Sequence, residues 1–192
     1  AIRLHTPERL QTSKIVIGND DRLEHAVRIR NTATGKKEAA IRARGYHGNK
    51  ATVDIKGLVD IEQDGADLID AGSQGEIHIG GGRIIAKGDE AAAVSVSGGA
   101  NVYLNSTDDG HGGIEAVAAE RDVQIEGNVL VRGSGVFGAA LKTKNSYLKG
   151  LIGTTFKEQG PSTRLYLGNG AYWENVEAGK QCSDQIKDGS HL

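Results

Sequence analysis

Residues 122–131 read DVQIEGNVLV, and this stretch decides the fold. Apolar and polar side chains alternate on both sides of its Gly-Asn pair, which is typical of two short strands that meet at a bend. Glycine and asparagine adopt a positive φ more readily than other residues, and sharp bends often need that conformation. The stretch therefore predicts a strand, a corner and a second strand.

Similar short alternating runs recur along the chain after residue 13. Aligning them gives a first column of apolar residues and a second column six positions further on: Ile55, Ile79, Leu104, Ile125 and Leu167 in the first, and Ile61, Ile85, Val131 and Trp173 in the second. Alanine-rich segments at 66–71, 91–97, 113–118 and 136–141 are predicted to form a third wall. Short strands that bury their inward faces only against neighbouring repeats are typical of solenoids, whose repeats span roughly 20–45 residues.

We predict an all-β chain that folds as a right-handed parallel β-helix, a β-solenoid of about six to seven rungs. Residues 13–180 are predicted to form the helix, residues 1–12 an N-terminal cap or tail, and residues 181–192 a C-terminal tail. The 28 glycines are about twice the usual share of roughly 7%, and only two prolines are present. Many corners and few rigid breaks fit this fold.

Three segments resemble the rungs of bacterial autotransporter passenger domains. They are residues 165–173, LYLGNGAYW, residues 75–85, GEIHIGGGRII, and residues 122–131. The similarity covers roughly residues 50–175, and it implies a secreted or cell-surface β-helix used for adhesion or self-association. A complete member also has a signal peptide and a translocator barrel, so the resemblance implies a passenger fragment.

We therefore expect a non-catalytic, virulence-related adhesin that is secreted or displayed on the bacterial surface. Its expected partner is a host-surface or matrix ligand, or another copy of itself. Residues 1–50 hold eleven Lys and Arg against five Asp and Glu, whereas residues 51–120 hold three against thirteen, and such bands would suit self-association. The net charge of -2 gives no reason to expect nucleic acid. No apolar run approaches the roughly 20 residues of a membrane span.

Two polar loops are the candidate binding sites. Residues 108–113, DDGHGG, form a longer break than the neighbouring corners, which predicts a protruding loop that presents Asp108, Asp109 and His111. Residues 46–49, YHGN, predict a similar corner that presents Tyr46 and His47. Binding residues gather on loops held by rigid scaffolds, although a plain flexible corner is the simpler interpretation of both segments.

A β-helical polysaccharide lyase or hydrolase, or a phage tail component, is the main alternative. Asp54, Asp60 and Glu62 alternate with aliphatic residues and are predicted to point outward. Together with Asp64, Asp67 and Asp70, they compare with the calcium-binding acids of polysaccharide lyases. Lys56 or Arg83 would be the base. A calcium site needs several oxygens at one point, and a solvated face explains the same acids.

Several motifs receive no functional role. Residues 133–138, GSGVFG, match the glycine spacing of a dinucleotide-binding loop, but the 139–144 segment is too short for the helix that such a loop needs. Residues 105–107, NST, are a formal glycosylation sequon. The histidines and the single Cys182 have neither zinc-ligand nor nucleophile spacing. We therefore expect no cofactor, no metal and no catalytic residues.

Overall fold

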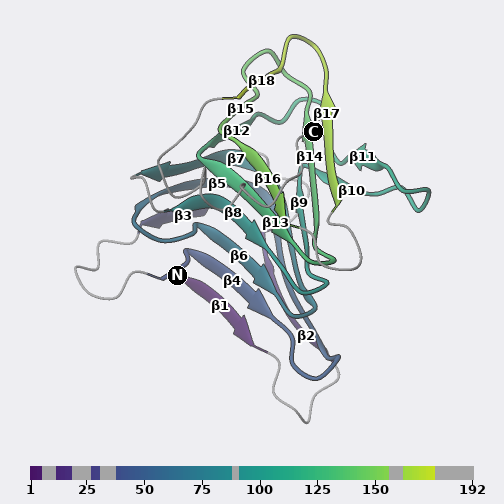
Figure 1. The fold of residues 1–192 in the computed structure, drawn as a ribbon. Helices are drawn as coiled ribbons and strands as arrows, with labels where there is room; N and C mark the ends of the chain where they lie inside the picture. The colour runs from purple at the N-terminus through teal and green to yellow at the C-terminus, as the bar shows by residue number, and fades with distance from the viewer. Residues whose placement is uncertain (6–11, 19–26, 31–37, 88–90, 156–161, 176–192) are drawn as a thin grey trace.

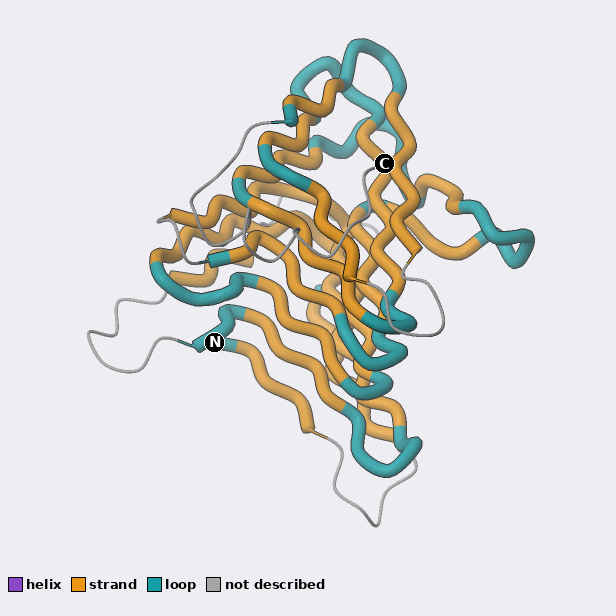
Figure 2. Tube along the Cα trace, in the orientation of Figure 1, coloured by secondary structure: helices purple, strands orange, loops and turns teal. Residues whose placement is uncertain are grey.

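A computed structural model describes residues 1–5, 12–18, 27–30, 38–87, 91–155 and 162–175. These residues form eighteen β-strands and no helix (Figures 1 and 2). The strands are β1 (Ile2–His5), β2 (Thr12–Ile17), β3 (Val27–Arg30), β4 (Ile41–Arg44), β5 (Lys50–Asp64), β6 (Ile69–Gly72), β7 (Gly75–Lys87), β8 (Ala92–Val96), β9 (Asn101–Leu104), β10 (Ser106–Asp108), β11 (Ile114–Ala116), β12 (Val123–Glu126), β13 (Asn128–Arg132), β14 (Val136–Leu141), β15 (Tyr147–Lys149), β16 (Ile152–Thr155), β17 (Ser162–Leu167) and β18 (Tyr172–Glu174). Within the described ranges, no helix is long and apolar enough to cross a membrane.

The strands build two parallel sheets and one hairpin. The smaller sheet has six strands in the order β1-β4-β6-β8-β13-β16. The larger has ten strands, with the order β17-β14-β9-β7-β12-β15-β18 and with β5 pairing with β2, β3 and β7. Among the described strands, only β10 and β11 pair antiparallel. The predicted all-β class and parallel pairing are therefore confirmed.

The chain visits the two sheets in a repeating order. From β4 in the smaller sheet it enters the first half of β5, which pairs with β2, and then the second half, which pairs with β3. It returns to the smaller sheet at β6 and repeats the path through β7 to β8. Figure 1 shows the two sheets facing each other as a nearly closed, barrel-like wall. The smaller sheet begins with β1, inside the segment 1–12 for which the sequence predicts a cap or tail.

The core consists of aliphatic columns that cross the strands. In the smaller sheet the column is Ile41, Ile69, Val94, Val129 and Ile152, and in the second half of the larger sheet it is Ile29, Ile61, Ile84, Ile125, Leu148 and Trp173. Nearly all of these side chains are buried. Each buried aliphatic side chain contributes about 1.5–3 kcal/mol, and only the neighbouring strands can supply that burial.

The first predicted column is correct as far as Leu104 and wrong beyond it. Ile55 pairs with Ile79, and Ile79 pairs with Leu104. Leu104 then pairs with Ala139, and Ile125 lies in the other column. The hairpin β10–β11 lies between β9 and β12 and lengthens that repeat, so spacing counted along the sequence places Ile125 in the wrong column.

The second predicted column is wrong at two positions. Ile61 pairs with Ile84 and not with Ile85, because a β-bulge shifts the register after Ile55. Val131 lies in the smaller sheet. Of the predicted alanine-rich walls, 66–71 and 91–97 contribute β6 and β8 to the smaller sheet, whereas 113–118 contains the hairpin strand β11 and 136–141 is β14 of the larger sheet.

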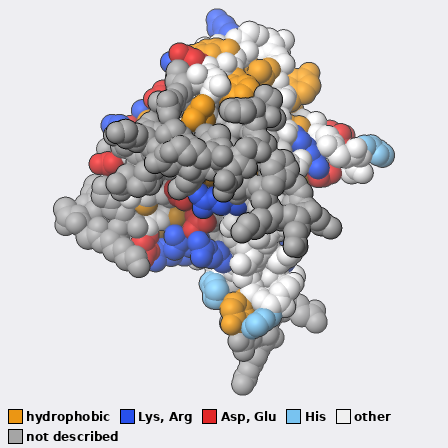
Figure 3. All heavy atoms as spheres, in the orientation of Figure 1, with side chains coloured by type: hydrophobic (Ala, Val, Ile, Leu, Met, Phe, Trp, Pro, Cys, Tyr) orange, Lys and Arg blue, Asp and Glu red, His pale blue; other side chains and the backbone are white. Residues whose placement is uncertain are grey.

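The basic N-terminal segment and the acidic middle segment face each other on adjacent strands. Asp70 Oδ2 accepts hydrogen bonds from Arg42 Nε at 2.7 Å and Arg44 Nη2 at 2.9 Å. Further pairs join Lys14 to Asp54, Arg28 to Asp60 and Lys50 to Glu76. On the side that carries the smaller sheet, Figure 3 shows basic atoms gathered beside acidic ones. Several charges of the two bands are thus paired within the molecule.

Candidate binding groove

A groove of about 320 Å³ lies on the outer face of the larger sheet. Strands β2, β5 and β7 contribute its residues on one side, and residues at the foot of the hairpin β10–β11 contribute the rest. The sequence places polar residues here because strand side chains alternate: Val53 and Ile77 are buried in the core, while Asp54 and His78 point outward. The volume lies at the lower end of the range for ligand sites, roughly 300–1,000 Å³.

Both carboxylates of the groove are paired with cations. Asp54 Oδ2 lies 3.2 Å from Lys14 Nζ and 3.3 Å from Lys56 Nζ. Glu76 Oε1 lies 2.6 Å from His78 Nε2, and its other oxygen pairs with Lys50. The hydrogen bond with His78 lowers the pKa of Glu76 to about 2, with Lys50 helping and burial opposing. Glu76 is therefore ionised at neutral pH.

Arg121 lies in the wall of the groove with only 5% of its surface exposed. Its Nη1 donates to the carbonyl oxygens of Lys56, at 2.9 Å, and Gly80, at 3.5 Å. Gly80 leaves the space for this contact, since a Cβ there would lie 2.5 Å from Nη1. The buried Nε has no hydrogen-bond partner. Among the described residues, the partners of the guanidinium group are carbonyl oxygens, and none is a carboxylate.

Ser106 lines the same groove from the start of β10 and is 3% exposed. Its hydroxyl oxygen is buried and has no hydrogen-bond partner among the described residues. Buried polar atoms in native proteins are satisfied by protein, water or a bound group, so an unsatisfied one is unusual. The groove contains two such side chains, Ser106 and Arg121.

Asn105 holds the foot of the hairpin. Its side chain is fully buried, donates to the Ala118 carbonyl at 2.7 Å and accepts from the Ala118 amide at 3.0 Å. Its backbone amide donates to the Ile79 carbonyl at 2.7 Å, and its φ of 48° turns the chain outward from β9. Asn105 belongs to the formal sequon of residues 105–107. In the structure it fixes where the hairpin leaves the sheet.

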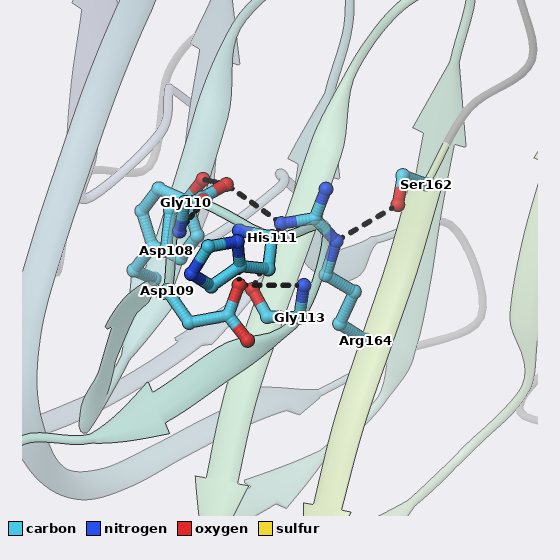
Figure 4. A network of polar contacts seen from close by, with 8 residues as sticks. Asp108, Asp109, Gly110, His111, Gly113, Ser162 and Arg164 are labelled. Atoms are coloured by element: carbon cyan, nitrogen blue, oxygen red, sulfur yellow. Dashed lines mark hydrogen bonds and ion pairs between the residues drawn. The ribbon is translucent and has the colours of Figure 1, made fainter.

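The predicted binding residues Asp108 and Asp109 help to shape the hairpin (Figure 4). Asp108 accepts from the Gly110 amide at 2.7 Å and from Arg164 Nη1 at 2.7 Å, and the contact with Arg164 lowers the pKa of the Asp108 carboxyl. Asp109 accepts from the amides of His111 and Gly113, both at 2.8 Å. The hairpin extends away from the sheets and presents His111 near its exposed tip (Figure 2).

Tyr46 and His47 lie in the turn between β4 and β5. Tyr46 is 40% exposed, and its ring centroid lies 4.0 Å from that of His47 and 6.0 Å from that of His5. Figure 1 places this turn at the lower end of the sheets and the hairpin at their side, so the structure does not bring the two predicted loops together. Ligand binding by either loop stays a prediction.

Tyr103 connects the groove to the hairpin. Its ring lies across Gly138, where a Cβ would come within 2.8 Å of Tyr103 Cδ1, and its hydroxyl donates to Asp108 at 3.4 Å. Gly138 is the last glycine of the GSGVFG motif, and the chain there continues as the strand β14. The motif therefore allows close packing of an aromatic ring and does not open a helix.

Comparison with known proteins gives no identification: no protein-family model, curated protein or solved structure matches this chain. In the ranges that the structure describes, no group of three or more His, Cys, Asp and Glu is arranged to hold a metal ion.

Proposed function

We propose that this chain is a stretch of right-handed parallel β-helix, of about six to seven rungs, from the passenger region of a bacterial autotransporter. The repeating strand order supports this proposal, because from β1 to β16 each passage through the larger sheet returns the chain to the smaller one. One strand of the six-stranded sheet then belongs to each rung. The resemblance of residues 75–85, 122–131 and 165–173 to passenger rungs supports the same family.

We further propose that the chain is a non-catalytic adhesin, secreted or displayed on the cell surface, that binds a host-surface or matrix ligand. The groove beside the hairpin carries this proposal, since it combines a concave site with a protruding loop on a rigid sheet. Self-association through the charge bands has less support, because Asp70, Asp54 and Asp60 are engaged by cations of the same molecule.

The rival enzymatic function has weaker support. A general acid or base works best with a pKa near the working pH, whereas Glu76 has a pKa of about 2. Asp60, the acid on which a lyase interpretation depends, lies 3.1 Å from Arg28 Nε and 3.3 Å from Arg83 Nη1. These contacts favour a structural role for Asp60.

The adhesive function is tested with beads coated with the purified chain. We expect many more coated beads than albumin-coated beads to remain on epithelial monolayers or on collagen and fibronectin after washing. A variant whose 108–113 loop is replaced by a two-residue Asn-Gly turn is expected to lose most of this retention. A variant with Tyr46→Ser and His47→Ser is the control for the distant turn.

Two outcomes would contradict the proposal. One is equal retention of chain-coated and albumin-coated beads while circular dichroism shows a folded chain. The other is release of unsaturated or reducing sugars from polygalacturonate or alginate in the presence of calcium, abolished by Asp60→Asn, which would make the chain an enzyme.

A further inference from the structure

We infer that the groove beside the hairpin binds a sugar unit that carries a single carboxylate or sulfate group, and that Arg121 receives that group. The inference rests on the proposed binding function, and it adds the chemical class of the ligand. It starts from two buried side chains that line the groove, Arg121 and Ser106, each with a polar atom that has no partner in the described part of the chain.

The charge of Arg121 is the first step. A buried cation is costly unless an anion or several acceptors compensate it. Arg121 has two carbonyl oxygens, both on Nη1, whereas Asp54 and Glu76 are engaged by Lys14, Lys56, His78 and Lys50. A planar guanidinium offers parallel N–H donors that match carboxylate and sulfate oxygens, so an oxyanion fits this position.

The hydroxyl of Ser106 is the second step. It lies in the same groove and is able both to donate and to accept a hydrogen bond. Thr52 and Thr107 add further hydroxyls to the lining, and Asp54 and Glu76 add acceptors. This mixture of donors and acceptors suits a ligand that is rich in hydroxyl groups, as a sugar is.

The carboxylates of the groove exclude a highly charged polyanion. Three cationic side chains, Lys14, Lys56 and Arg121, line the groove together with the two acids Asp54 and Glu76. A nucleic acid would bring one phosphate per nucleotide close to both acids, and the repulsion would offset its contact with Arg121. A sugar with one acidic group avoids that repulsion.

Binding to the purified full chain is measured by isothermal titration calorimetry with four probes: an oligosaccharide with a single galacturonate unit, an oligosaccharide with a single sulfate group, neutral maltohexaose and single-stranded DNA. We expect at least one of the two acidic oligosaccharides to bind, and binding to weaken as salt rises. We expect no measurable binding of maltohexaose. The acidic probe that binds more tightly distinguishes a carboxylate from a sulfate ligand.

Two kinds of variant locate the site. Arg121→Gln is expected to weaken binding by about tenfold or more, the effect of losing a charge-assisted contact. Because Arg121 is buried and this variant risks misfolding, a second pair uses Val117, which is 55% exposed and lines the groove. Val117→Glu places a negative charge at the groove and is expected to abolish binding, whereas the matched neutral variant Val117→Gln is expected to retain most of it.

Three results would overturn the inference: no binding of either acidic oligosaccharide, equal binding by Val117→Glu and Val117→Gln, or tighter binding of DNA than of both oligosaccharides. The bead assay separates this inference from the adhesive function. If beads coated with either Val117 variant adhered as well as wild-type beads, the adhesive function would stand, and the groove would be rejected as its site. Binding of an acidic oligosaccharide without retention of the beads would support the groove as a sugar site and reject the adhesive function.

Discussion

The imidazole ring of His78 stacks on the phenol ring of Tyr103, with the ring centroids 5.2 Å apart and the planes at 26°. Parallel pairing of β7 with β9 places the two residues opposite each other on the outer face. His78 also contacts Glu76 in the groove, and Tyr103 contacts Asp108 in the hairpin. One row of contacts therefore connects the groove with the hairpin.

The first prediction concerns Tyr103 at alkaline pH. Burial, together with the charge of Asp108, raises the pKa of Tyr103 from 10.0 to about 12. The folded state thus holds this proton more tightly than the unfolded state does. The resulting stabilisation is complete below the unfolded pKa of 10.0 and is lost as the pH rises through about 12. Burial raises the pKa of Tyr147 to about 12 as well, with the same consequence.

We expect the free energy of unfolding to fall between about pH 10 and pH 12, and Tyr103→Phe to reduce that fall. At pH 7 the variant should lose little stability, because the contact of the Tyr103 hydroxyl with Asp108 in the wild type is long, at 3.4 Å. Urea unfolding of both proteins at neutral and alkaline pH measures the difference. If the free energy of unfolding fell equally with pH in wild type and variant, Tyr103 would not contribute to the loss of stability at alkaline pH.

The second prediction concerns Glu76 at acid pH. Its pKa is lowered from 4.5 to about 2, so its stabilisation is present above the unfolded pKa of 4.5 and is lost as the pH falls through about 2. Glu76→Gln should lower the free energy of unfolding by about 1–2 kcal/mol at pH 7 and flatten its decline between pH 4.5 and pH 2.

The matched control is Glu115→Gln on the exposed side of β11. Its free energy of unfolding at pH 7, measured with urea, should stay within about 0.5 kcal/mol of wild type, as for most surface substitutions. If Glu76→Gln behaved like Glu115→Gln at each pH, the contacts of Glu76 with His78 and Lys50 would not stabilise the fold.

The orientation of side chains was predictable from the sequence because it is a local property of a strand. Val53 and Ile77 turn inward, and Asp54 and His78 turn outward, as the period-two alternation predicts. Strand partners were less predictable, because the bulge after Ile55 and the inserted hairpin change the spacing of the repeats. A count along the chain does not reveal either irregularity.

The groove was not predictable, because its decisive contacts are distant in sequence. Arg121 bonds to the Lys56 carbonyl across 65 positions, and the fold alone brings the two together. Asn105 offered a partial signal: a residue with a high tendency for positive φ directly after the apolar run Val102–Leu104, at the start of the longest polar break. That signal marks a turn, but it does not show that the side chain is buried.

The third prediction concerns Asp70, which bonds to Arg42 and Arg44. Its side chain is 8% exposed, whereas those of the two arginines are 32% and 49% exposed. Asp70→Asn should destabilise the fold by about 1–3 kcal/mol, less than for a fully buried pair. Glu174→Gln is the control, since Glu174 lies 3.8 Å from Lys149 and is half exposed, and it should change stability by less than about 0.5 kcal/mol. Equal urea midpoints for the two variants would contradict a stabilising role of Asp70.

The last prediction compares two asparagines with similar backbones, Asn105 with a φ of 48° and Asn169 with a φ of 51°. Replacing either by alanine puts a residue that tolerates the left-handed region less well than asparagine at the same φ, at a cost of about 1 kcal/mol. Asn169 is exposed and loses one bond, to the Lys142 carbonyl, whereas Asn105 is fully buried and leaves the Ala118 amide and carbonyl without their side-chain partner.

Asn105→Ala should therefore destabilise the fold by about 3 kcal/mol and Asn169→Ala by about 1 kcal/mol. Asn105→Gly tolerates the same φ and should fall between wild type and Asn105→Ala, because it loses the side-chain bonds alone. Urea unfolding measures all three, and limited proteolysis should cut the hairpin of Asn105→Ala faster than that of Asn169→Ala. If the two alanine variants matched in stability and in cleavage rate, the buried bonds of Asn105 would not hold the hairpin against the sheet, and the wall of the groove would need another support.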